Sequence, residues 1–113
     1  MSAQLDDLTR LPLRAAFQKA AEEALVSLVE GAPVSVLVMD VDQFKLINDT
    51  FGHLQGDDVL RTVADILRSS LRGADLPARY AGDEFVALLP NTTVEGAFEV
   101  AERICAAIRA HGA

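Results

Sequence analysis

The segment Arg79–Phe85 most constrains what this chain can fold into, because it places two acidic residues in a predicted hairpin turn. Within it the small pair Ala81–Gly82 is followed by the acidic pair Asp83–Glu84 and then by an apolar run. Small residues between two strand-like segments are typical of a tight turn that joins antiparallel strands. The turn would therefore hold two carboxylates. Acidic residues in turns are often simply solvated, so this feature alone leaves that alternative open.

A second acidic turn is predicted upstream, at the end of another strand. The largely apolar run from Val34 to Met39 is followed by Asp40, Val41 and Asp42. Because this strand is apolar on both faces, we expect it to be central in the sheet. Two strand ends that both supply carboxylates can form a site for hard divalent cations on rigid elements. The pair of acidic turns is more specific than either turn alone.

Composition predicts one globular domain and excludes several kinds of partner. The chain has 113 residues, of which 50% are hydrophobic, enough for a single core. No apolar run approaches the roughly 20 residues that span a bilayer, so we expect no membrane segment. The net charge of −7 argues against nucleic acid or an anionic membrane as the main partner, because both attract positive surfaces. With one cysteine no internal disulfide can form, which is consistent with a cytoplasmic location.

Hydrophobic periodicity predicts the order helix, strand, two helices, two hairpin strands, helix. Three segments have apolar residues at three- and four-residue steps, as on one face of a helix, and a short helix is expected over 43–51. Strands are expected at about 34–39, 76–80 and 84–89. This order implies an α/β sandwich, in which helices pack on a mixed central sheet.

Local signals predict where three of the helices begin. Pro12 suits the first turn of the first helix. Gly52–Asp57 is predicted to be a loop, with Asp57 as the cap of the third helix. Thr92, with Glu95 three residues later, predicts a capping box at the start of the last helix.

Several spaced blocks of this chain together resemble the GGDEF family of diguanylate cyclases. They are Asp7-Leu8-Thr9, Asp40-Val41-Asp42-Gln43-Phe44-Lys45-Leu46-Ile47-Asn48-Asp49, Phe51-Gly52-His53, Gly56-Asp57 and Arg79-Tyr80-Ala81-Gly82-Asp83-Glu84-Phe85. The resemblance runs from Asp7 to the end of the chain. It implies a fold like the palm of polymerases and nucleotidyl cyclases, and condensation of two GTP molecules into cyclic di-GMP with release of pyrophosphate. Each domain of a homodimer would bind one GTP and face the other.

The resemblance also implies two divalent ions, Mg²⁺ or Mn²⁺, in each active site. Asp40 and the Val41 carbonyl would hold metal. Asp83 and Glu84 would complete the metal site and assist deprotonation, and the division of these roles stays open. Lys45 would be catalytic by meeting phosphate charge, and its alternative is a solvated surface lysine. Such ions lower the pKa of an attacking hydroxyl and neutralise the leaving group.

Six residues, among them Lys45, match the nucleotide-binding positions of the family. Asn48 and Asp57 would read the guanine edge, since a carboxylate accepts two hydrogen bonds that adenine cannot donate. His53 would make a further nucleotide contact, and N–H groups after Phe44 would bind phosphate at a helix start. Gly82 belongs to the signature turn beside the substrate. For Asp57, a purely structural role as a helix cap is the alternative.

The segment Arg72-Gly73-Ala74-Asp75 resembles the Arg-x-x-Asp site through which cyclic di-GMP inhibits family members. A guanidinium can bind guanine or phosphate with two parallel hydrogen bonds, and Asp75 would pair with the guanine edge. Arg103 matches a second arginine that reaches this site from a neighbouring domain. The alternative is an arginine at a helix end beside a loop aspartate.

The chain departs from the family pattern in two ways. Ala81 replaces the first signature glycine, and Arg10 and Leu13 replace the usual glycine and asparagine of the N-terminal block. We also expect residues 1–113 to be one GGDEF domain that lacks its C-terminal strands and last helix. Two functions follow as hypotheses: a diguanylate cyclase module, weakened by truncation, or an inactive receptor that binds cyclic di-GMP.

Overall fold

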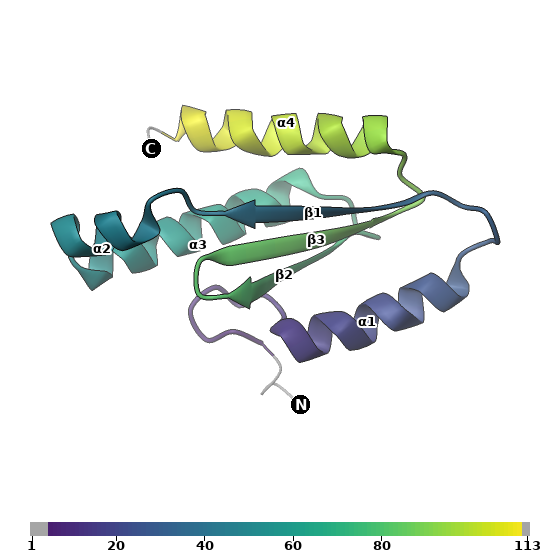
Figure 1. Ribbon diagram of the computed structural model, residues 1–113, viewed down its shortest axis with the longest axis horizontal. Helices are drawn as coiled ribbons and strands as arrows, with labels where there is room; N and C mark the ends of the chain where they lie inside the picture. The colour runs from purple at the N-terminus through teal and green to yellow at the C-terminus, as the bar shows by residue number, and fades with distance from the viewer. Residues whose placement is uncertain (1–4, 112–113) are drawn as a thin grey trace.

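The computed structural model describes residues 5–111 and confirms the predicted order of elements (Figure 1). The α/β class is also confirmed, with helices flanking an antiparallel sheet. Their bounds are α1 Arg14–Ser27, β1 Val34–Asp40, α2 Phe44–Phe51, α3 His53–Ser70, β2 Leu76–Ala81, β3 Glu84–Pro90 and α4 Val94–Ala110. In this described part of the chain no helix is both long and apolar enough to cross a membrane.

The described strands form an antiparallel sheet in the order β1-β3-β2. The central strand is therefore β3, in which every residue from Phe85 to Pro90 is buried. The prediction that β1 is central was wrong, because β3 pairs with both of the other strands. Along β1 the residues alternate between exposed and half-buried, and Val36 and Val38 remain 56% and 65% exposed. Apolar residues on both faces of a strand thus do not require that both faces be covered.

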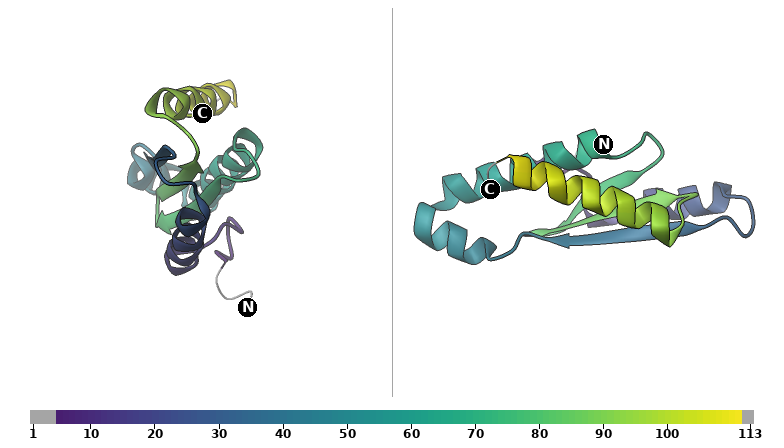
Figure 2. Two further views of the ribbon diagram at one scale, coloured as in Figure 1. Left: turned by 90° about the vertical axis from the view of Figure 1, so that its right-hand side faces the viewer. Right: turned by 90° about the horizontal axis from the view of Figure 1, so that it is seen from above.

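Helices cover the two faces of the sheet differently, as the views in Figure 2 show. Alternate residues of a strand point to opposite faces. Phe85, Ala87 and Leu89 accordingly pack in a core with α3 and α4, while Val86 and Leu88 pack with Phe17 of α1. The first core is the larger of the two. It packs the start of β3, at Phe85, against α3, and Phe44 of α2 lies at its border.

The N-terminal segment forms a turn before α1, so the prediction that Pro12 lies in the first helical turn was wrong. Asp6 accepts hydrogen bonds of 2.7 Å from both the backbone N–H and the hydroxyl of Thr9. Pro12 then pairs with the sheet edge, where its carbonyl accepts a bond of 3.0 Å from the Arg79 N–H. Because this bond uses an extended backbone, the helix begins only at Arg14.

Two further predicted boundaries were wrong. Gly52, with φ at 91°, caps both α2 and α3, so the expected loop over 52–57 is reduced to this one residue. Asp57 lies inside α3 and cannot be its cap. At α4 the cap is Thr93, whose hydroxyl accepts a bond from the Gly96 N–H, and the neighbouring Thr92 is buried instead.

Candidate active site

The two predicted acidic strand ends meet at one end of the sheet. Asp40, the last residue of β1, lies directly opposite Glu84, the first residue of β3. The Val41 N–H donates a hydrogen bond of 3.0 Å to the Asp83 carbonyl. This bond makes Asp40 and Glu84 a non-hydrogen-bonded pair, the arrangement in which opposed side chains approach most closely. Figure 1 shows the β2–β3 turn, the end of β1 and α2 at this same end of the sheet.

Arg79 holds the acidic turn in place. Ala81 pairs with Glu84, which leaves Gly82 and Asp83 as the two turn residues. The Nε and Nη2 atoms of Arg79 donate to the Gly82 carbonyl over 3.0 and 2.7 Å. Ala81 takes an ordinary negative φ, and a Cβ on Gly82 would meet no atom within 4 Å. The alanine at the first signature position therefore fits this backbone without strain.

The same arginine ties the turn to the N-terminal segment. Its Nη1 donates to both carboxylate oxygens of Asp6, each over 3.1 Å. Both side chains are largely buried, with 18% of Arg79 and 14% of Asp6 exposed. Burial by itself raises the pKa of Asp6, but the hydrogen bonds from Thr9 and Arg79 outweigh it and hold that pKa below its ordinary value. Asp6 is thus stabilised in its charged form.

The predicted guanine-reading residues lie where α2 meets α3. Asn48 is half-buried on α2, and within residues 5–111 its Oδ1 atom is buried without a hydrogen-bond partner. Asp57 is half-buried on α3, directly after the buried Gly56. Buried polar atoms are nearly always paired in folded proteins, so an unpaired one requires an explanation such as a ligand.

The remaining predicted substrate residues are placed around these helices. Phe44 is the first residue of α2 and is half-buried, whereas His53, the first residue of α3, is exposed. Lys45 is 89% exposed and pairs with Asp49 over 3.7 Å. This contact is weak and solvated, so it leaves Lys45 free to meet another charge.

The acidic residues fit a metal site that is completed by substrate. Within residues 5–111, no three His, Cys, Asp or Glu side chains are grouped closely enough to hold an ion by themselves. Asp40 and Glu84 instead offer two opposed carboxylates at strand ends. Mg²⁺ is commonly bound by one or two carboxylates together with substrate phosphates. The donor set therefore suits such an ion, with Asp83 one residue away in the turn.

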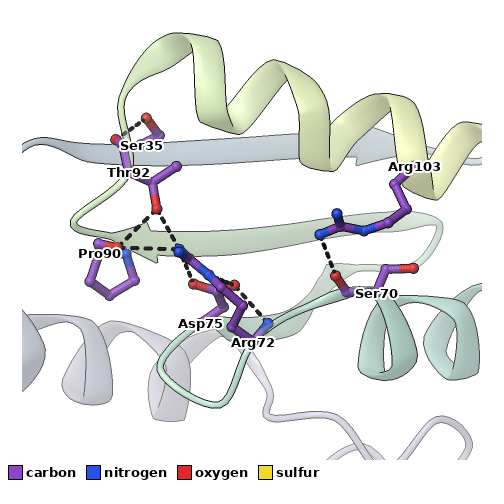
Figure 3. A network of polar contacts seen from close by, with 7 residues as sticks. All are labelled: Ser35, Ser70, Arg72, Asp75, Pro90, Thr92 and Arg103. Carbon is purple, nitrogen blue, oxygen red and sulfur yellow. Dashed lines mark hydrogen bonds and ion pairs between the residues drawn. The ribbon is translucent and has the colours of Figure 1, made fainter.

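Two of the predicted inhibitory residues, Arg72 and Asp75, lie between α3 and β2 (Figure 3). Asp75 has a fully buried side chain, and its Oδ2 accepts from the backbone N–H of Arg72 over 2.9 Å. The Arg72 guanidinium donates to the same carboxylate over 3.1 and 3.3 Å while remaining 55% exposed. The hydrogen bond and negative charge of Asp75 raise the pKa of Arg72.

Arg103 and Thr92 contact the same region from α4 and the loop before it. Arg103 donates over 2.9 Å to the Ser70 carbonyl, at the end of α3. Thr92 accepts a hydrogen bond from Arg72, and its own carbonyl accepts one of 2.8 Å from Ser35. Figure 3 shows Arg103 bonded to Ser70 and not to Arg72.

Sequence reasoning missed three residues that organise these sites. Asp6 and Thr92 are distant in sequence from the arginines that they contact, so no local pattern identified them. Gly56 belongs to the Gly56-Asp57 block, and a Cβ built on it would lie only 1.8 Å from Asn48 Oδ1. A glycine inside a stretch that otherwise fits a helix was the available signal.

Comparison with known proteins identifies the family. The sequence profile described as "Diguanylate cyclase, GGDEF domain" matches residues 3–112. Diguanylate cyclase DgcP of Pseudomonas aeruginosa is 47% identical over 109 residues, covering 96% of this chain and 16% of that protein. Response regulator PleD of Caulobacter vibrioides is 55% identical over 74 residues, covering 66% of this chain and 16% of that protein. The chain belongs to the GGDEF domain family.

Solved structures agree with this assignment. The GGDEF domain of DgcB from Caulobacter crescentus, in complex with c-di-GMP, matches with a TM-score of 0.84 and 34% identity over 92% of this chain and 61% of that one. Diguanylate cyclase SiaD from Pseudomonas aeruginosa, in complex with its activator SiaC, matches with a TM-score of 0.83 and 39% identity over 94% of this chain and 41% of that one. Relative to the curated proteins DgcP and PleD, the match covers 16% of each length, about one sixth.

Proposed function

We propose that this domain is the catalytic module of a diguanylate cyclase, which condenses two GTP into cyclic di-GMP and two pyrophosphates. The 3′-oxygen of each GTP forms a bond with the α-phosphorus of the other, and each α–β phosphoanhydride bond breaks. Each hydroxyl loses a proton as it attacks. Because the two reactions are reciprocal, two domains must face each other, each with one bound GTP.

The observation that carries this proposal is the opposition of Asp40 and Glu84 across two strands, fixed by the Val41–Asp83 hydrogen bond. Strands hold carboxylates more rigidly than loops do, which suits a reaction that depends on positioning. When bound, Mg²⁺ or Mn²⁺ would supply charge neutralisation at the triphosphate and lower the pKa of the hydroxyl. Asp40, the Val41 carbonyl, Asp83 and Glu84 are the groups that would hold these two ions.

The second part of the proposed site reads the base and phosphates. Asn48 and Asp57 would contact the guanine edge, and the unpaired Asn48 Oδ1 supports this role because it needs a donor. The free N–H groups at the start of α2, from Phe44 onward, would bind phosphate oxygens, as helix N-termini do. Lys45, exposed beside them, would add a positive charge, and His53 a further contact.

A turnover assay tests this proposal. Purified domain is incubated with GTP and Mg²⁺, and cyclic di-GMP and pyrophosphate are quantified. We expect product in a ratio of two pyrophosphates per cyclic di-GMP, and loss of at least about a hundredfold in rate for Glu84→Gln, which keeps the shape but removes the charge. Glu95→Gln, an exposed position on α4, is the control. Unchanged turnover in Glu84→Gln would refute the assigned site.

We propose a second, regulatory site at Arg72, Asp75 and Arg103, where cyclic di-GMP binds and inhibits. The exposed side of the Arg72 guanidinium would bind the ligand, because Asp75 is buried and its oxygens already accept from Arg72. Asp75 would thus hold the arginine in place, and direct pairing with guanine would require the loop to open. Arg103 would join from a neighbouring domain after release of its bond to Ser70.

The alternative function is a receptor for cyclic di-GMP in which the catalytic site is idle. The preformed Arg72–Asp75 pair favours it, because ligand binding there needs no turnover. Calorimetry with cyclic di-GMP on the wild type, Arg72→Ala and Arg61→Ala, together with the turnover assay, separates the two functions. Arg61 forms an exposed pair with Asp58 at the same three-residue spacing and serves as the matched control. Binding that only Arg72→Ala abolishes, without any turnover of GTP, would favour the receptor.

A further inference from the structure

Gly56 lies inside α3, where glycine is unfavourable unless a tertiary contact requires it. It is the fourth residue of α3 and is buried, and its N–H donates over 3.2 Å to the Gly52 carbonyl. Glycine is among the poorest helix formers. Within residues 5–111 the glycines with positive φ are Gly31 and Gly52, so the backbone conformation does not demand glycine at position 56.

Asn48, beside Gly56, supplies that contact. A Cβ built on this residue would lie 1.8 Å from Asn48 Oδ1 and 2.9 Å from Asn48 Cγ. It would also lie 3.3 Å from Cζ of Phe44. No carbon atom can approach a non-bonded oxygen to 1.8 Å, so the Asn48 carboxamide stands in the volume that the Cβ of any other residue would fill.

We propose that Gly56 is a positioning residue that determines specificity for guanine. Its missing side chain leaves a slot on α3 that holds the Asn48 carboxamide against Gly56, the residue before Asp57. Asn48 Oδ1 is the carboxamide atom nearest to the Cβ built on Gly56, and among the described residues it is buried without a hydrogen-bond partner. This inference deepens the proposed guanine site and rests on it.

The conflict created by a Cβ falls on the far end of the Asn48 side chain, which can rotate. Gly56→Ala should therefore fold normally, because alanine favours the helix and Asn48 can turn out of the slot. What it should lose is the orientation of the carboxamide. A fall in melting temperature that Asn48→Ala fails to relieve would place the conflict elsewhere and overturn the proposal.

Binding measurements test the effect on specificity. Guanosine and adenosine triphosphates with a methylene bridge between the α and β phosphates, which cannot release pyrophosphate, are titrated with Mg²⁺ into four proteins: wild type, Gly56→Ala, Asn48→Ala and the double variant. We expect Gly56→Ala to weaken guanosine binding about tenfold, as for one lost hydrogen bond, with adenosine binding unchanged. The double variant should bind no more weakly than Asn48→Ala. Independent, multiplying losses would overturn the proposal.

A second measurement needs no nucleotide. The side-chain amide signals of Asn48 are assigned by their loss in Asn48→Ala and followed by nuclear magnetic resonance. We expect Gly56→Ala to shift them, and Gly73→Ala, whose added Cβ would meet no atom within 4 Å, to leave them in place. Unshifted signals in Gly56→Ala would refute the slot. If the wild type binds neither nucleotide, the proposed function fails while this spectrum still decides the role of Gly56.

Discussion

Asp6 is a charged residue tied to the acidic turn through Arg79, which bonds both to Asp6 and to the Gly82 carbonyl. Because its pKa is lowered by folding, it contributes stability that is complete above the pKa of the unfolded chain. That contribution is lost as the pH falls below about 4 and through the lower pKa of the folded state. The stability of the domain should therefore have an acid-sensitive component at this site.

Asp6→Asn is expected to lower the free energy of unfolding by about 1–2 kcal/mol at pH 7, since it removes charge-assisted hydrogen bonds. The difference from the wild type should shrink as the pH falls below about 4, where Asp6 itself becomes neutral. Urea unfolding between pH 7 and pH 3 measures both effects. Asp7→Asn, at the exposed neighbouring position, should change stability by less than about 0.5 kcal/mol. A pH-independent difference for Asp6→Asn would contradict the assignment.

At the scale of elements, the start of α4 depends on two adjacent threonines with different partners. Thr93 caps the helix, and Thr92 accepts from Arg72 and donates over 2.9 Å to the Pro90 carbonyl. Thr93→Ala should cost about 1 kcal/mol of stability, and Thr93→Ser should retain most of it because serine also caps helices. Thermal unfolding measures both.

Thr92→Val provides the contrast, because it keeps the shape and removes the buried hydroxyl. It should lower stability because the Arg72 guanidinium loses a hydrogen-bond acceptor. It should also weaken cyclic di-GMP binding, whereas Thr93→Ala should leave that binding unchanged. Calorimetry with cyclic di-GMP distinguishes the two variants. Equal effects of both substitutions on binding would show that Arg72 does not depend on Thr92.

The order of elements was predictable because apolar periodicity and turn residues are local properties. The place of β1 was not, because the position of a strand depends on which strands pair with it, and β3 pairs with both neighbours. The helix boundary at 52–57 also failed. Gly52 and Gly56 look alike in sequence, yet the first ends a helix with a positive φ and the second lies inside one, beside Asn48. Only tertiary contact separates these two uses of glycine.

The sequence indicated which residues belong to the candidate site, but not most of the contacts that these residues make. The opposition of Asp40 and Glu84 follows from two acidic strand ends, once the strands pair in this register. The ion pair between Arg72 and Asp75 could not be derived from their spacing alone. A three-residue separation permits an internal ion pair and a shared ligand equally, and the burial of Asp75 favours the former in the absence of ligand.

For the whole molecule, the proposed reaction needs two copies that each carry a net charge of −7. Activity per molecule should therefore rise with protein concentration at low concentrations, where pairing limits the rate. Added monovalent salt should raise it further at saturating GTP, because screening weakens repulsion between like-charged partners. A rate per molecule that is constant over a hundredfold dilution would contradict the need for two facing domains.

One guanidinium, that of Arg79, bonds at once to Asp6 before the first helix and to the Gly82 carbonyl in the acidic turn. Displacement of the chain around Asp6 would break the ion pair between Arg79 and the Asp6 carboxylate. The Arg79 guanidinium could then move relative to the Gly82 carbonyl, to which it also bonds. The position of the proposed catalytic acids would therefore depend on the position of the chain around Asp6. A displacement at that end would reach the acidic turn through one ion pair and two hydrogen bonds.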